Sequence, residues 1–146
     1  MTNTGSYYPP RITRLGQDYL ATGADIDRLL DSDYDRHWLL VLETYQERCW
    51  LHRRLSQADE GSTKAAELAA ELAELAEVSA LQALRATKQL LDGLLDQRRR
   101  LMIDARVEGA SWADIGAVLD VSRQAAHELY HRQIKNPWTI SRVKKS

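Results

Sequence analysis

The sequence predicts an all-α protein in which a long helical hairpin is followed by a pair of short C-terminal helices. Apolar side chains recur at three- and four-residue steps over residues 34–57, as they do on one face of a helix. Residues 64–93 are dominated by Ala, Leu and Glu, which lose little free energy on entering a helix. The chain shows neither an alternating apolar and polar pattern nor a repeat of roughly 20–50 residues, so strands and solenoids are not expected.

An N-terminal arm and short helices are expected over residues 1–33. Two consecutive prolines favour extended backbone in the arm. A short helix is expected over residues 11–20, followed by a break that contains a glycine. Asp25 is a suitable N-cap for a second helical stretch that reaches Leu30. The segment 31–33, Asp-Ser-Asp, offers the N-cap for the helix that follows.

Residues 34–95 are expected to form the helical hairpin. Gly61 suits the reversal between its two helices, and Thr63 can cap the second one. The second helix, residues 64–93, is expected to pack antiparallel on the first, with packing against a second copy of the chain as the alternative. Polar residues at the seam positions of a strict heptad argue against a regular coiled coil. Because its apolar faces could pack against a second copy of the chain, the hairpin is the predicted site of oligomerisation.

A third helical segment and two short capped helices are expected in residues 96–135. Ser111 can cap a helix of about eight residues, and Asp114 stands where a capping pair needs it. Gly116 is small enough to let a second helix approach closely. A tight turn between the two helices needs a residue that tolerates positive φ, then an apolar plug, then a new N-cap. Asp120, Val121 and Ser122 have these properties in that order.

Charge is distributed unevenly along the chain. Residues 1–96 carry 10 Lys/Arg and 16 Asp/Glu, a net charge of −6, whereas residues 97–146 carry 10 Lys/Arg and 5 Asp/Glu, a net charge of +5. A basic segment beside an acidic one indicates that the C-terminal part faces an anion, most often a nucleic acid.

Several features of the sequence indicate a cytoplasmic protein. No apolar run is long enough to span a bilayer, and the N-terminus lacks the basic and apolar segments of a secretory signal. Cys49 cannot form an internal disulfide, which fits a reducing compartment, and it is expected to be a small buried residue on a helix. Contact with a membrane is not expected.

Three short phrases stand where the two capped helices meet: Gly109-Ala110-Ser111-Trp112, Ile115-Gly116 and Leu119-Asp120-Val121-Ser122-Arg123. This segment resembles the bacterial helix-turn-helix superfamily, in particular the fourth region of sigma factors and related actinobacterial regulators. The family usually has glycine where this chain has Asp120, and aspartate tolerates the left-handed region at a modest cost. The resemblance implies that residues 96–135 form a helix-turn-helix DNA-binding domain.

The resemblance implies a set of side chains that face the major groove: Ser122, Arg123, Gln124, His127, Glu128 and His131. These residue types suit base recognition, because Arg can bridge two acceptors of guanine, Gln can pair with adenine and Glu can accept from cytosine. Basic side chains lie around this segment and can contact phosphates: Arg98, Arg99, Arg100, Arg106, Arg132 and Lys135. Residues 136–146 form a basic tail, in which Trp138 is expected to dock on the domain, with insertion into DNA as the alternative.

A zinc-peptidase pattern, H-E-x-x-H, is matched by residues 127–131. Only three residues of the pattern are fixed, so chance matches are common. After His131 the chain has no His, Asp, Glu or Cys that could supply a third metal ligand. The same residues also fall on the expected recognition helix. Neither enzymatic activity nor a cofactor is therefore expected.

The sequence thus predicts a transcriptional regulator that binds double-stranded DNA as a homodimer or higher homo-oligomer. Assembly is expected because a single small module binds weakly, whereas a symmetric dimer reads two half-sites. The alternative is a helical adaptor that uses the same fold to contact a protein, such as RNA polymerase or another part of the transcription machinery, or a packaging or partition partner.

Overall fold

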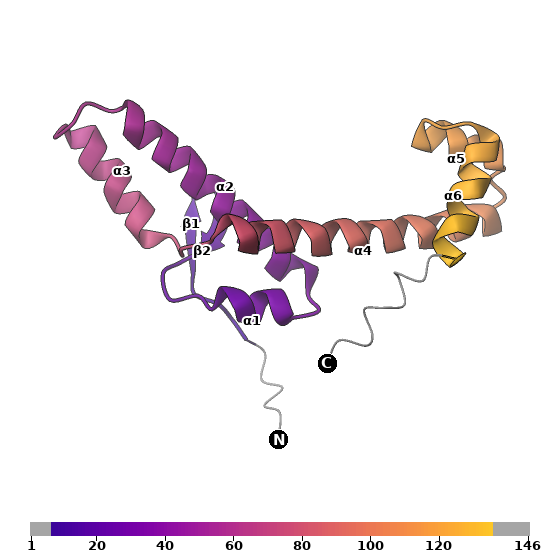
Figure 1. Ribbon diagram of the computed structural model, residues 1–146, viewed down its shortest axis with the longest axis horizontal. Helices are drawn as coiled ribbons and strands as arrows, with labels where there is room; N and C mark the ends of the chain where they lie inside the picture. Colours follow the sequence, from indigo (N-terminus) through magenta and orange to yellow (C-terminus); the bar gives the residue numbers. More distant parts are fainter. Residues whose placement is uncertain (1–6, 136–146) are drawn as a thin grey trace, which may run out of the picture. The chain divides into compact units, whose positions relative to one another are not determined.

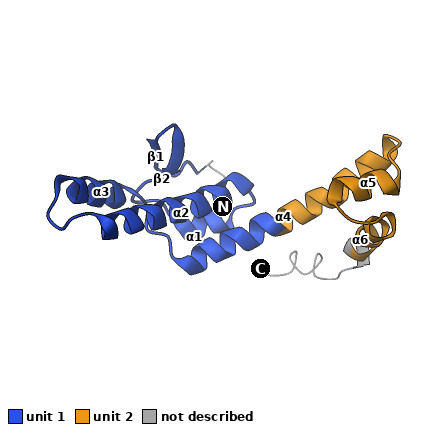
Figure 2. Cartoon of the chain, turned by 90° about the horizontal axis from the view of Figure 1, so that it is seen from above, with its two compact units in different colours: residues 1–91 blue, residues 92–146 orange. Residues whose placement is uncertain are grey.

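The computed structural model describes residues 7–135 and is mostly helical (Figure 1). Two strands and six helices make up the described chain: β1 (Arg11–Arg14), β2 (Gln17–Leu20), α1 (Ile26–Asp31), α2 (Asp35–Gln57), α3 (Thr63–Glu74), α4 (Ala80–Val107), α5 (Trp112–Leu119) and α6 (Arg123–Lys135). The chain divides into two compact units, residues 1–91 and 92–146 (Figure 2). The predictions for the start of the arm and for the tail that contains Trp138 lie outside the described residues.

Residues 11–20 form an antiparallel hairpin, so the helix predicted there is wrong and the fold is not purely helical. Leu15 and Gly16 both have positive φ, 52° and 79°, which is the combination that a two-residue type I′ turn requires. Such turns usually have Asn-Gly or Asp-Gly, whereas here leucine, which seldom adopts positive φ, takes the first position. The sequence therefore lacks the usual signal for this turn. The hairpin ends at the buried Leu20, whose N–H donates to Thr44 Oγ1 on α2 at 2.9 Å.

Of the three helix caps predicted in this unit, one is confirmed, one is displaced by a residue and one is absent. Asp25 caps α1 as predicted, because its side chain accepts from the N–H of Arg28 at 3.2 Å. No side chain caps α2, because its N-cap position is held by Tyr34 instead of a residue of the Asp-Ser-Asp segment. Ser62 caps α3 in place of the predicted Thr63. The displaced cap moves the start of α3 by one residue.

The single helix predicted over residues 64–93 is wrong, because the chain is extended between α3 and α4. The N–H of Ala76 donates to Leu20 O at 2.9 Å, and the N–H of Thr22 donates to Glu74 O at 3.0 Å. The end of the hairpin thus pairs with the chain that leaves α3. A capping box starts α4, in which Ser79 and Gln82 each accept from the other's backbone N–H. The helix then continues through residues 93 and 96 without the predicted boundary.

Unit 1 has two buried clusters that join its helices. One brings α1, α2 and the start of α4 around Leu20 and Val41. The other packs Leu51 of α2 against Leu68 of α3 and against Leu75, which directly follows α3. Figure 1 shows α2 and α3 side by side. The predicted packing of the second helix on residues 34–57 is therefore confirmed for the part that forms α3. Cys49 is exposed on α2, so its predicted burial is wrong. In the described part of the chain, no helix is long and apolar enough to cross a membrane.

Candidate nucleic-acid interface

The candidate interface is built on the core of unit 2, where residues 92–107 of α4 pack with α5 and α6. Met102, Ile115 and Ala126 are buried at its centre, one from each helix. Two half-buried leucines, one from α5 and one from α6, also pack on this core: Leu119 and Leu129. Val121 is 36% exposed and lies outside the cluster, so its predicted role as an apolar plug is wrong.

The turn between α5 and α6 depends on two backbone features. Asp120 adopts the left-handed conformation that the sequence predicts, with φ 56° and ψ 43°. The N–H of Val121 donates to Gly116 O at 2.8 Å. A Cβ on Gly116 would lie 2.7 Å from Val121 O and 3.0 Å from Ser122 O. The two helices therefore meet backbone against backbone, and only glycine leaves room for this approach.

Both short helices start at the caps that the sequence predicts. Ser111 and Asp114 form a reciprocal capping box, with bonds of 2.8 Å and 3.0 Å. The hydrogen bonds from Ser111, first from its backbone N–H and then from its side chain, lower the pKa of the Asp114 carboxyl. Ser122 Oγ accepts from the N–H of Ala125 at 3.0 Å and so caps α6. The Ser122 cap fixes where α6 begins and therefore which side chains stand in its first turn.

The predicted base-reading residues share one property, which is that all of them are exposed: Ser122, Arg123, Gln124, His127, Glu128 and His131. They differ in whether their side chains already form hydrogen bonds or ion pairs with neighbouring residues. Glu128 accepts from Gln124 Nε2 at 3.3 Å and pairs with Arg132 Nη2 at 3.7 Å. The Arg123 side chain makes neither a hydrogen bond nor an ion pair with the described part of the chain. Arg123 is thus the most available of these side chains, whereas Glu128 is held by its own helix.

An aromatic cluster that was not predicted from the sequence connects α5 to α6. Trp112 lies edge to face with His127, with 5.1 Å between the ring centres, and it also contacts Tyr130. Arg106 covers the Trp112 ring at 5.1 Å and donates to Ala110 O at 3.0 Å. Arg106 was predicted as one of the cations around the segment, but these contacts commit it to the loop before α5. No local pattern of residue types signals this cluster, because its rings come from two different helices.

The predicted phosphate-binding cations fall into different environments. Arg98 and Arg99 are half-buried, and Arg100 and Arg132 are exposed. The Nε of Arg98 is buried and has no hydrogen-bond partner among the described residues. Lys135 ends α6, but its side chain lies outside the described part of the structure. Exposure therefore favours Arg100 and Arg132 for contact with phosphates.

An apolar groove of about 500 Å³ runs between residues 94–105 of α4 and α5. Its exposed rim includes Leu94, Leu101 and Val118, and its floor is formed by Met102 and Ile115. Arg98 also lines the groove, so the half-buried arginine lies beside apolar side chains. An exposed apolar surface of this kind is typical of protein contacts rather than of phosphate contacts.

The histidine pair of the zinc pattern is close on α6, with 3.1 Å between His127 Nε2 and His131 Nε2. Within residues 7–135, no group of three or more His, Cys, Asp or Glu side chains is placed to hold a metal ion. Comparison of the chain with family models, curated proteins and solved structures finds no match. The resemblance of residues 109–131 to helix-turn-helix proteins stays a prediction, and the site geometry carries the functional proposal.

Proposed function

We propose that residues 92–135 form a helix-turn-helix that binds double-stranded DNA sequence-specifically, with α6 as the recognition helix. One observation carries the proposal, namely the tight α5–α6 turn at Gly116 together with the uncovered polar face of α6. Two short helices that cross at such a turn place the second helix in the major groove in helix-turn-helix proteins. The protein would then act as a transcriptional regulator in the cytoplasm.

The first turn of α6 carries most of the sequence recognition in this proposal. Arg123 is exposed and unpaired within the described chain, so it can reach the two acceptors of guanine without breaking another contact. Gln124 exchanges one long hydrogen bond, 3.3 Å to Glu128, for a contact with adenine. His127 is exposed but already held against Trp112, which suits it to position the helix on the DNA backbone.

The salt dependence of binding tests this proposal directly. Fluorescence anisotropy of the full chain on mixed-sequence duplex DNA should show an affinity that falls steeply as salt is raised. If about five cations contact phosphates, the slope of log affinity against log salt should be about −4.5. Absence of binding at low salt, from a protein whose circular dichroism is helical, would contradict the proposal.

We also propose that the protein binds DNA as a homodimer or higher homo-oligomer through its N-terminal unit. Exposed leucines on α4 support this, since Leu84 and Leu91 are 64% and 55% exposed and lie seven residues apart on one face. Leu81, another exposed leucine, extends the same face by one turn. Burial against a second copy would remove this apolar surface from water.

Polar substitution of this face should dissociate the assembly. A Leu84→Gln, Leu91→Gln variant is expected to raise the dimer dissociation constant at least about tenfold in sedimentation equilibrium, because each leucine loses its apolar burial. Leu15→Gln is the matched control, since Leu15 is 94% exposed at the tip of the hairpin. Equal association of wild type, variant and control would place the oligomer interface elsewhere.

A second candidate function is that of an adaptor whose helix-turn-helix contacts a protein. The apolar groove between α4 and α5 favours this alternative, because its exposed leucine and valine side chains suit an apolar helix from a partner. The salt titration separates the two functions. DNA binding that is steep in salt supports the first, and a folded protein without DNA affinity leaves the groove as the functional surface.

A further inference from the structure

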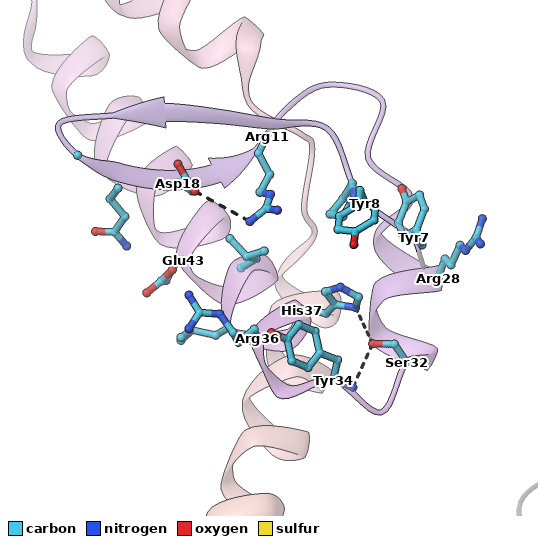
Figure 3. A pocket seen from close by; sticks show the side chains of 15 residues that line it. Tyr7, Tyr8, Arg11, Asp18, Arg28, Ser32, Tyr34, Arg36, His37 and Glu43 are labelled. Carbon is cyan, nitrogen blue, oxygen red and sulfur yellow. Dashed lines mark hydrogen bonds and ion pairs between the residues drawn. The ribbon is translucent and has the colours of Figure 1, made fainter. Parts of the chain in front are cut away.

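Unit 1 contains a pocket of about 920 Å³ that the proposed DNA binding does not use (Figure 3). Its walls come from the chain before β1, the β1–β2 hairpin, α1 and the first turns of α2. Binding sites for small molecules typically have about 300–1,000 Å³. All the lining residues lie between residues 7 and 43, so the pocket belongs wholly to unit 1.

The pocket concentrates positive charge in an acidic unit. Residues 1–91 carry 10 Lys/Arg and 14 Asp/Glu, yet the pocket lining includes three arginines and only two carboxylates, Asp18 and Glu43. Arg11 lies 4.0 Å from Asp18, which is a loose ion pair. Arg28 and Arg36 make no ion pair with any described residue. The lining therefore has positive charge that is free to meet an anion.

Aromatic side chains lie beside these cations. The N–H of Asp25 donates to the Tyr7 hydroxyl at 3.1 Å, and the Arg28 guanidinium lies 4.3 Å from the Tyr7 ring centre. These two contacts hold the Tyr7 ring in place. Tyr8 and Tyr34 are exposed at the pocket and leave ring surface open. Such rings can stack on a planar ligand or pack along its edge.

His37 gives the pocket a polar group whose state can be assigned from its contacts. Ser32 has one hydroxyl proton, which it donates to Leu29 O at 2.8 Å. His37 Nδ1, 2.8 Å from Ser32 Oγ, is then the donor in that pair, which leaves Nε2 as an acceptor. Burial, and then the positive charge of Arg11, lower the pKa of His37 and so favour the neutral ring.

We propose that this pocket binds a small ligand that combines a planar aromatic ring with an anionic group, either a carboxylate or a phosphate. Arg11 and Arg36 face the pocket from the hairpin and from α2, so the anion would lie between two separate elements. The tyrosines would contact the ring. The site is independent of the DNA-binding proposal, because it shares no residue with unit 2.

A pair of dyes that differ only in one anionic sulfonate group tests the proposal on the full chain. Anilinonaphthalene sulfonate carries an aromatic system and an anion, whereas phenylnaphthylamine has the same rings without the sulfonate. The sulfonate dye is expected to bind at least about tenfold more tightly, as judged by fluorescence titration. An Arg11→Gln, Arg36→Gln variant should lose this preference while its circular dichroism stays unchanged.

The apolar groove of unit 2 could also bind a dye, so a control variant is needed there. Leu101→Gln alters the groove and should leave the preference for the sulfonate dye intact. Equal affinity for the two dyes, or a preference that survives loss of both arginines, would overturn the proposal.

Competition then identifies the anion. Displacement of the dye by adenosine monophosphate but not by hydroxyphenylacetate would assign an aromatic phosphate, and the reverse would assign an aromatic carboxylate. Inorganic phosphate and adenosine serve as the anion and the ring alone, and each should compete poorly. If neither anionic compound displaces the dye at millimolar concentration, the pocket does not bind this class of ligand and the proposal fails.

Discussion

Replacing Gly116 with alanine is expected to lower the free energy of unfolding of unit 2 by about 1–3 kcal/mol. The added Cβ would lie 2.7 Å from Val121 O and 3.0 Å from Ser122 O. Both atoms belong to the backbone, and the Val121 N–H is bonded to Gly116 O at 2.8 Å, so no side chain can rotate to relieve the overlap. Thermal and urea unfolding, followed by circular dichroism, would measure the loss.

Gly93→Ala is the matched control for this variant. Gly93 lies within α4, and a Cβ there would meet nothing within 4 Å. Alanine is favoured over glycine inside a helix by about 1 kcal/mol, so this control should be as stable as the wild type or slightly more stable. If the two alanine variants were equally stable, the close approach of α5 and α6 at Gly116 would be refuted.

An Arg123→Ala, Gln124→Ala variant is expected to lose about 100-fold or more in affinity for its preferred DNA site. Each side chain can make a two-point contact with a base, and such a contact discriminates by about 1–3 kcal/mol. Both residues are exposed in the first turn of α6, beyond the core of unit 2, so the variant should stay folded. Anisotropy on a duplex obtained by selection from random sequence would measure the loss, with a scrambled duplex in parallel.

Arg132→Ala provides the comparison for a cation that contacts phosphate only. Arg132 is exposed further along α6 and is paired weakly with Glu128 at 3.7 Å. Its loss should weaken binding to the preferred and the scrambled duplex by the same factor and reduce the salt slope by about 0.9. If the double variant behaved in this same uniform way, Arg123 and Gln124 would not read bases.

The C-terminal unit could be predicted closely because its decisive interactions are local in sequence. The capping box joins Ser111 to Asp114, three residues apart, and the left-handed conformation belongs to Asp120 itself. Glycine at position 116 is required by a carbonyl only five residues away, at Val121. Interactions within one helical turn or one tight turn leave their mark on adjacent residue types, and those residue types are visible in the sequence.

The sequence contains one local signal, for the start of α4, that the prediction of a single helix over residues 64–93 did not use. The residues from Ser79 to Gln82 form the S-x-x-Q pattern of a capping box, and this box starts α4 in the structure. The Ala- and Leu-rich composition on both sides favours one uninterrupted helix, and that propensity was given more weight. A cap pattern inside a helical run therefore indicates a boundary even where propensity is high.

The sequence by itself determined the mostly helical class, the limits of α2 and α5, and the caps and turn of the C-terminal pair of helices. Only the tertiary structure decided the β1–β2 hairpin, the extended break between α3 and α4, and the pocket of unit 1. The chain around Leu20 and Thr22 bonds to the chain around Ala76, more than 50 residues away, and each segment is extended because the other supplies its hydrogen bonds. These hydrogen bonds join backbone groups that are far apart in the sequence, and no local pattern of residue types predicts such a pairing.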